Sequence, residues 1–184
     1  MKDLSAQTKS IRKNIVAMIH EAGSGHPGGS LGMADVFASL YFEILKHDPR
    51  NPAWNERDYL ILSAGHICPV LYATLAEAGY FDKDLLKTLR KFGSKLQGHP
   101  HLKKGESLPG VENSAGPLGQ GLSISCGLAE ALKLDNKPNR VFAILSDGEL
   151  DEGQTMEAMM YAGSNHLDNI TVLIDRNRIQ LSGN

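Results

Sequence analysis

Two short apolar runs stand on either side of a segment with helical periodicity in the last third of the sequence. The first run spans residues 141–145 and is followed by Ser146-Asp147-Gly148, and the second spans residues 170–174 and is followed by Asp175-Arg176-Asn177. Short apolar runs bounded by turn-forming residues are typical of buried strands. The pattern predicts a strand–helix–strand unit with parallel strands, in which both polar loops lie at the same edge of the sheet.

Apolar residues at helical spacing predict most of the other elements. Ile11, Ile15 and Met18 recur at the spacing of helix turns, which predicts a helix from Leu4 to Ala22 that ends at Gly23. A third strand is predicted at residues 59–62. Four further helices are predicted at residues 33–45, 69–78, 83–92 and 122–134. The predicted fold is therefore α/β, with a parallel sheet flanked by helices.

The composition is that of an ordinary globular domain. The 184 residues suffice for one α/β domain, and the net charge of −2 gives no reason to expect nucleic acid or an anionic membrane surface as a partner. No apolar stretch approaches the roughly twenty residues of a membrane span, and the first residues lack the apolar core of a signal peptide. The two cysteines, Cys68 and Cys126, indicate neither a disulfide framework nor a zinc site, so we expect a cytoplasmic protein.

Asp147 and Asn177 are the candidate metal ligands. They lie thirty positions apart, but each follows one of two neighbouring predicted strands, so both can face the same small volume. A carboxylate and an amide oxygen suit Mg²⁺ or Ca²⁺, and Mg²⁺ usually completes its shell with water and phosphate. The residues thus suggest a divalent cation that bridges the protein to a phosphorylated ligand, although an Asp-Gly turn is also common after a strand.

Histidine and glycine are concentrated in four other loops. His26 and His99 each lie in a Gly-His-Pro tripeptide, and His66 follows the first predicted strand, where site residues are favoured over surface ones. Taken alone, His26 is also compatible with a loop histidine that has no function, and His66 is also compatible with a helix cap. The glycine-rich stretch 113–121 precedes a helix, but its spacing is not the dinucleotide fingerprint, so alone it is weak evidence for phosphate binding.

These segments together resemble the amino-terminal half of a transketolase. Five of them occur in the family's order, namely residues 24–29, 63–66, 98–100, 113–121 and 146–180. The Gly-His-Pro-Gly and Gly-Pro-Leu-Gly-Gln-Gly loops are similar to those of transketolase rather than to the wider group of thiamine enzymes. The family's Gly-Asp-Gly motif is Ser-Asp-Gly here, and a serine at position 146 restricts the backbone more than glycine does. The resemblance implies the thiamine-diphosphate-binding fold of the diphosphate-binding (PP) type.

The resemblance also implies an activity and a set of site residues. The activity is transfer of a two-carbon glycolaldehyde unit from a ketose phosphate to an aldose phosphate, with thiamine diphosphate and Mg²⁺ as cofactors and Ca²⁺ as a possible substitute. The implied metal ligands are Asp147, Asn177 and the backbone carbonyl of Ile179. The other implied cofactor contacts are His66, Gly116, Pro117, Leu118 and Gly148. The implied catalytic residues, which bind substrate, are His26 and His99.

The acidic residues after Gly148 have a plainer interpretation. Glu149, Asp151 and Glu152 stand at the start of a helix, where negative charge is favoured by the helix dipole. By resemblance, Glu152 and Glu157 lie near a subunit interface.

One part of the family's machinery has no counterpart in this sequence. Family members activate the cofactor with a glutamate from a pyrimidine-binding domain. We therefore expect residues 1–184 to form a diphosphate- and Mg²⁺-binding domain that is incomplete at its C-terminal end. We also expect it to act in an oligomer with a C-terminal transketolase subunit or with missing C-terminal domains of its own. The alternatives are a deoxyxylulose-phosphate synthase-like enzyme, a Mg²⁺-dependent phosphohydrolase using Asp147, and an inactive remnant that only assembles with a partner.

Overall fold

The structure, a computed structural model, describes residues 3–180. Within them the chain forms two compact units, each built from two separate stretches of sequence. The helical unit contains residues up to 57 and residues 66–114, and the sheet unit contains residues 58–65 and those from 115 onward. In the described residues no helix combines the length and apolar character needed to cross a bilayer.

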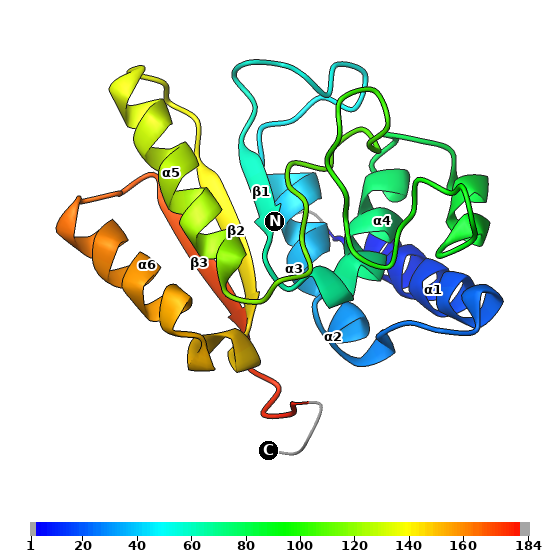
Figure 1. Ribbon diagram of the computed structural model, residues 1–184. Helices are drawn as coiled ribbons and strands as arrows, with labels where there is room; N and C mark the ends of the chain where they lie inside the picture. The colour runs from blue at the N-terminus through cyan, green and yellow to red at the C-terminus, as the bar shows by residue number, and fades with distance from the viewer. Residues whose placement is uncertain (1–2, 181–184) are drawn as a thin grey trace. The chain divides into compact units, whose positions relative to one another are not determined.

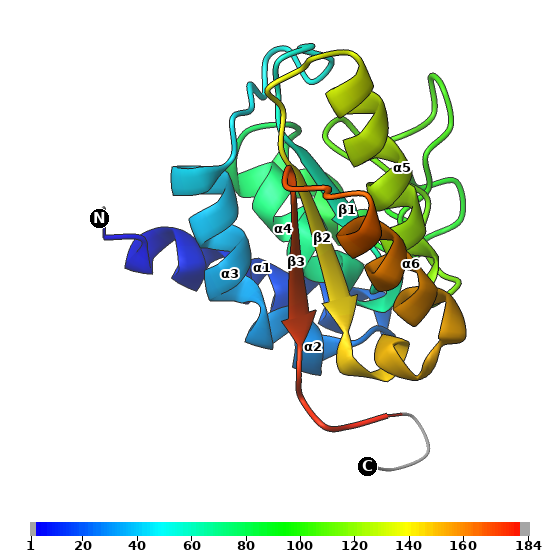
Figure 2. The ribbon, with the colours of Figure 1, turned by 90° about the vertical axis from the view of Figure 1, so that its left-hand side faces the viewer.

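The sheet unit is built on three parallel strands in the order β1-β2-β3. Their bounds are β1 Tyr59–Leu62, β2 Val141–Ser146 and β3 Ile170–Asp175. Ser146 pairs with Asp175 in the register, so β2 and β3 end side by side. Figure 2 shows their arrowheads at the same edge of the sheet. The predicted strand–helix–strand unit is confirmed, and the two polar loops begin next to each other.

Two helices, α5 (Gln120–Leu134) and α6 (Gly153–Ser164), cover one face of this sheet (Figure 1). Side chains alternate along a strand, so Val141, Ala143 and Leu145 of β2 all face the helices and are fully buried. Burial of a side chain such as Leu145 contributes about 1.5–3 kcal/mol. Small residues on the helices, including Ala129 of α5, allow close packing against the sheet.

The helical unit contains several short helices packed around the long helix α1. One stripe of α1 is fully buried at Ile11 and Ile15, as the periodicity predicts, and the helix ends at Gly23. The bounds are α1 Ser5–Ala22, α2 Pro27–Gly32, α3 Ala34–Ser39, the π-helical turn Leu40–Ile44, α4 Cys68–Glu77 and the 3₁₀ turn Lys83–Thr88. A further 3₁₀ turn, Gly65–Ile67, and the 3₁₀ turn Asp147–Asp151 of the sheet unit complete the helical elements that the described residues form.

Two predicted helices differ from the structure. The predicted helix 33–45 is a succession of α3 and a π-helical turn, and α2 forms earlier, inside the Gly-His-Pro-Gly loop, because Pro27 is well suited to the first turn of a helix. The predicted helix 83–92 ends at Thr88 in 3₁₀ form. Asp82 does cap it by accepting the Asp84 N–H, but Arg90 has a left-handed φ of 59°, which an α-helix cannot continue through.

Candidate functional site

The loops after β2 and β3 are held together at the sheet edge. The backbone N–H of Arg178 donates to Oδ2 of Asp147 at 2.6 Å. Further along, Nε2 of Gln180 donates to Oδ2 of Asp151, also at 2.6 Å. The loop after β3 therefore lies on the loop after β2. Asp147 thus contacts the loop that bears Asn177, through the backbone of Arg178, the next residue along the chain.

The candidate metal ligands at this edge would all bind through oxygen atoms. Asp147 is partly exposed, and its Oδ1 accepts the Gly148 N–H at 3.1 Å, which leaves lone pairs on the carboxylate for a further ligand. Asn177 and Ile179 are exposed, and Oδ1 of Asn177 accepts the Ile179 N–H at 2.9 Å. The part of the chain described holds no cluster of three or more His, Cys, Asp or Glu side chains suited to a metal. One carboxylate with amide and carbonyl oxygens is a hard donor set that fits Mg²⁺ and excludes soft metals.

Ser146 fits its position without strain. Its backbone is extended, with φ −94° and ψ 160°, a conformation that any residue adopts. The restriction expected from serine in place of glycine therefore has no consequence for the backbone here. The Ser146 N–H donates to Oε2 of Glu149 at 2.9 Å, and its hydroxyl lies 3.4 Å from the same oxygen.

The glycine-rich loop leads directly into α5. Gly116 is partly exposed, Pro117 is exposed, and the apolar side chain of Leu118 keeps 40% of its surface exposed. Gly119 then turns the chain with φ 80°, a left-handed value that favours glycine. A Cβ added at Gly121 would stand 2.4 Å from Cβ of Ser63, so the start of α5 lies against the tip of β1.

Glu149 is the residue of this region whose role the sequence analysis missed. Its side chain is completely buried, although its position in the sequence suggests only an acid near a helix start. Oε1 accepts the Gly119 N–H at 2.9 Å and the Ser63 hydroxyl, and Oε2 accepts from Ser146. The available signal was the spacing Ser-x-x-Glu from Ser146, which is the capping-box pattern.

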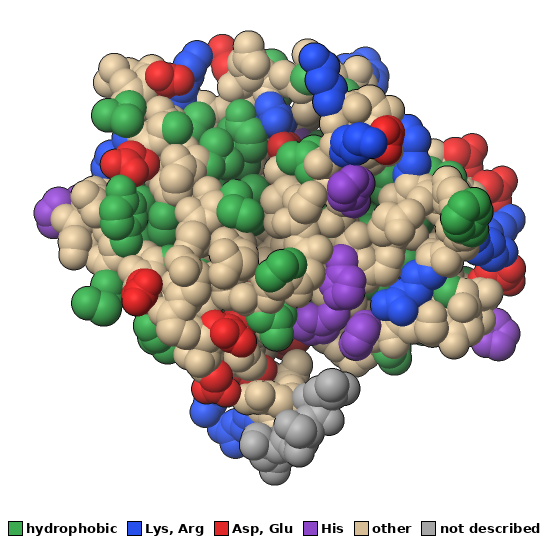
Figure 3. Space-filling view, in the orientation of Figure 1, with side chains coloured by type: hydrophobic (Ala, Val, Ile, Leu, Met, Phe, Trp, Pro, Cys, Tyr) green, Lys and Arg blue, Asp and Glu red, His purple; other side chains and the backbone are tan. Residues whose placement is uncertain are grey.

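The three predicted histidines belong to the helical unit. The rings of His26 and His66 meet edge to face, with centroids 5.4 Å apart. Histidine side chains gather on the face seen in Figure 3. Partial desolvation of its ring, with repulsion from the Arg90 guanidinium and from His99, lowers the pKa of His26 below its usual 6.5. His26 is therefore neutral near pH 7 and can both donate and accept a hydrogen bond.

Helix α4 anchors the loop that carries His99. The Cys68 thiol donates to the Gly98 carbonyl at 3.2 Å, and the Tyr72 hydroxyl donates to the Gln97 carbonyl at 3.0 Å. Burial raises the pKa of Cys68 to about 12. The thiol is therefore protonated at neutral pH and serves as a structural donor.

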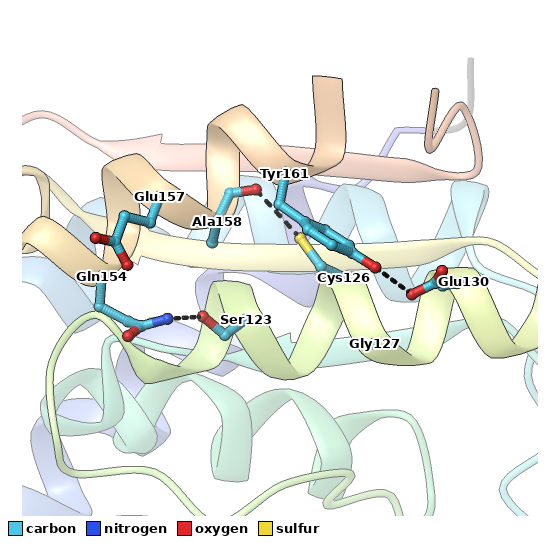
Figure 4. A pocket seen from close by; sticks show the side chains of 8 residues that line it. All are labelled: Ser123, Cys126, Gly127, Glu130, Gln154, Glu157, Ala158 and Tyr161. Carbon is cyan, nitrogen blue, oxygen red and sulfur yellow. Dashed lines mark hydrogen bonds between the residues drawn. The ribbon is translucent and has the colours of Figure 1, made fainter. Parts of the chain in front are cut away.

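A separate hollow of about 360 Å³ opens between α5 and α6 (Figure 4). Across it, Gln154 donates to the Ser123 hydroxyl at 2.6 Å, and the Tyr161 hydroxyl donates to Glu130 at 2.6 Å. This hydrogen bond raises the pKa of Tyr161. None of the predicted cofactor or substrate residues lines the hollow, so it is distinct from the candidate site.

Comparison with known proteins gives a consistent family assignment. Residues 4–184 match the family model described as transketolase, thiamine diphosphate binding domain. The chain is 45% identical over 181 residues to a 6-deoxy-6-sulfo-D-fructose transketolase subunit of Clostridium sp. (strain MSTE9), covering 98% of this chain and 65% of that subunit. It is 38% identical to one of the apulose-4-phosphate transketolase subunits of Phocaeicola vulgatus, covering 100% of this chain and 64% of that relative.

Solved structures agree with this assignment. The transketolase of Leishmania mexicana superposes with a TM-score of 0.90 at 35% identity, covering 99% of this chain and 28% of the enzyme. The transketolase of Campylobacter jejuni superposes with a TM-score of 0.89 at 37% identity, covering 98% of this chain and 29% of the enzyme. The chain thus spans less than two thirds of the subunit-type relatives named above and under a third of these two transketolases.

Proposed function

Because the chain belongs to the transketolase family and carries its thiamine diphosphate binding domain, we propose that it takes part in two-carbon transfer. The proposed reaction moves a glycolaldehyde unit from a ketose phosphate to an aldose phosphate. The observation that carries the proposal is the hydrogen bond from the Arg178 N–H to Asp147, since it joins the two loops that bear the proposed metal ligands.

The sheet unit supplies the proposed cofactor contacts. Asp147, Asn177 and the carbonyl of Ile179 hold Mg²⁺, and the backbone of Gly148 contacts the diphosphate. The exposed Leu118, with Gly116 and Pro117, supports the thiamine rings. When bound, the cofactor supplies the nucleophilic carbon and the electron sink of the reaction. The protein orients the cofactor and polarises the substrate carbonyl.

The helical unit supplies the proposed histidines. His26 and His99 bind substrate hydroxyls and polarise the carbonyl, and His66 donates to the diphosphate. The lowered pKa of His26 supports this role, because a neutral imidazole donates from one nitrogen and accepts at the other. The positive charge of Arg90, which helps to lower that pKa, also favours a substrate that carries a negative group.

We further propose that a pyrimidine-binding half completes the active unit, either as a separate C-terminal subunit or as further domains of the same protein. The support is the coverage: the chain aligns with 65% of a transketolase described as a subunit. Residues 1–184 would then be part of a diphosphate-binding domain in a cytoplasmic oligomer. The subunit-type relatives carry the names of a sulfonated and a phosphorylated sugar, so the donor is proposed as a ketose with a negatively charged end, of the kind that the pentose phosphate pathway handles.

The test is a titration of the full-length protein, together with its pyrimidine-binding half, with thiamine diphosphate in the presence of Mg²⁺. Isothermal calorimetry is expected to give saturable binding. Replacement of Asp147 by asparagine is expected to raise the dissociation constant at least ~10-fold, since a metal ligand loses its charge. Asp168→Asn is the matched control, because Asp168 is an exposed acid of the same unit that pairs with Lys133.

Two results would contradict the proposal. One is the absence of binding by the unaltered protein with its partner half present, which favours an inactive remnant. The other is equal affinity of the Asp147→Asn and Asp168→Asn variants, which removes Asp147 from the metal site.

A further inference from the structure

Glu149 is a buried carboxylate whose partners are all neutral donors. Its side chain has no exposed surface, and no Lys or Arg of residues 3–180 forms an ion pair with it. It accepts instead from two backbone N–H groups, those of Gly119 and Ser146, and from serine hydroxyls. A buried carboxyl group is costly unless its oxygens are hydrogen-bonded, and both oxygens of Glu149 accept hydrogen bonds here.

The donors come from three places that are distant in the sequence. Ser63 follows β1, Gly119 precedes α5, and Ser146 ends β2. Oε1 joins the first two, and Oε2 binds the third. One side chain therefore ties the glycine-rich loop to the loop that bears Asp147.

The direction of these hydrogen bonds requires Glu149 to be an acceptor. The Gly121 N–H donates to the Ser63 hydroxyl oxygen at 3.1 Å, and that hydroxyl then donates to Oε1. Gly119 and Gly121 lie at the amino end of α5, where the helix dipole favours a negative charge. Glu149 thus occupies the amino terminus of α5.

We propose that Glu149 is a positioning residue for thiamine diphosphate, which fixes the ring-binding loop relative to the loop that holds the metal and the diphosphate. This inference rests on the proposed function. Gly116, Pro117 and Leu118 stand within three residues of Gly119, and Asp147 is adjacent to Ser146. A change at Glu149 moves both sets of contacts, although Glu149 touches neither part of the cofactor.

The test is Glu149→Gln in the full-length protein with its pyrimidine-binding half. Glutamine keeps the size of the side chain, but its amide group is a donor that must face an N–H or O–H donor in this pocket. One loop is then forced away. The dissociation constant of thiamine diphosphate is expected to rise at least ~10-fold, and the Mg²⁺ concentration for half-saturation is expected to rise with it. The dissociation constant and the Mg²⁺ concentration are both measured under conditions in which circular dichroism shows that the variant is fully folded.

Three further variants separate positioning from a general loss of stability. Thr74→Val removes a buried hydroxyl that donates to the Val70 carbonyl in the helical unit. It is expected to lower the melting temperature and leave the cofactor affinity unchanged. Ser63→Ala removes one donor to Glu149 and is expected to raise the dissociation constant about 3-fold. The double variant Ser63→Ala/Glu149→Gln is expected to bind no more weakly than Glu149→Gln alone, because both residues act through one contact.

The outcomes distinguish this inference from the proposed function. If the unaltered protein with its partner half binds no thiamine diphosphate, the proposed function fails. If it binds and Asp147→Asn weakens binding, but Glu149→Gln binds as the unaltered protein does, only the positioning role is overturned. Should Glu149→Gln fail to fold, an unchanged affinity in Ser63→Ala overturns the role instead.

Discussion

At the scale of single residues, His26 illustrates how neighbours determine acid–base behaviour. Desolvation of the ring is the largest cause of its lowered pKa, followed by repulsion from Arg90 and from His99. The effect on stability has a definite sign. Above pH 6.5 the imidazole is neutral in both the folded and the unfolded chain, so it contributes nothing there. As the pH falls from 6.5 through the lower pKa of the folded state, the unfolded chain binds the proton more readily, and stability declines.

The predicted consequence is a titration of His26 below pH 6.5 that depends on Arg90. Arg90→Gln removes the nearby positive charge and is expected to raise the pKa of His26 toward 6.5 without reaching it, because desolvation remains. NMR detection of the imidazole proton resonances measures both values. Lys103→Gln is the control, since this exposed lysine of the same unit pairs with Glu106 and is not among the causes of the shift. A pKa that is the same in Arg90→Gln and the unaltered protein would contradict the electrostatic account.

The sequence predicted which polar loops lie together, because their placement follows from the parallel strands. Asp147 and Asn177 each follow a strand, and the parallel arrangement brings their loops together. Glu149 was missed because its Ser-x-x-Glu spacing from Ser146 predicts only a capping box and gives no sign that the side chain is buried. Its burial depends on Ser63 and Gly119, which lie 86 and 30 positions away. Such a contact exists only once the fold has brought three loops together.

At the scale of elements, the three strands were predicted because each is a continuous apolar run, buried on both faces in β1 and β2. The helices were predicted less accurately where their ends depend on backbone geometry. The segment at 83–92 has helical apolar spacing, but the left-handed φ of Arg90 and the hydrogen bond of its N–H to the Leu96 carbonyl belong to a turn. Periodicity carries no information about such a turn.

Helix α5 allows a prediction in which the same substitution has opposite effects at two positions. Gly121→Ala places a Cβ 2.4 Å from Cβ and 2.6 Å from Cα of Ser63, so backbone must move, and a loss of about 1–3 kcal/mol is expected. Gly127→Ala meets nothing within 4 Å, so a gain of about 0.5–1 kcal/mol is expected from the better helix propensity of alanine. Urea denaturation of both variants measures the two free energies of unfolding. Stabilisation by Gly121→Ala would show that α5 does not rest on the tip of β1.

At the scale of the whole molecule, the two units are interleaved along the chain, which passes between them after residues 57, 65 and 114. Adjacent residues at the first passage are tied to different units. Arg57 donates twice to Glu112, at 2.7 and 2.9 Å, within the helical unit. Asp58 accepts from the backbone and from the guanidinium of Arg140, both at 2.8 Å, within the sheet unit. Local patterns give no sign of this interleaving, because it depends on which distant segments pack together.

The interleaving predicts that residues 115–184 do not fold alone. Without residues 58–65, β2 loses a neighbouring strand, the apolar cluster loses Ile61, and Glu149 loses the Ser63 hydroxyl. Each unpaired strand group and the under-satisfied buried carboxylate costs about 1–3 kcal/mol. The sum of several such losses is comparable with the whole stability of a small domain, about 5–15 kcal/mol. A chain of residues 115–184 is expected to show no cooperative urea transition and no slowly exchanging amides in β2.

A second chain, matched to this fragment, restores only residues 58–65 with strand β1. A Cβ on Gly65 would stand 2.8 Å from Cβ of Ala115, so these two residues are in contact, and a link of two glycines can join residues 58–65 directly to residue 115. The joined chain regains the β1–β2 hydrogen bonds and the Ser63 contact of Glu149, and is expected to gain amide protection in β2 over the unjoined fragment, measured by hydrogen exchange. Equal protection in the two chains would mean that β1 does not organise the loops around Glu149, since the two differ only in that strand and its link.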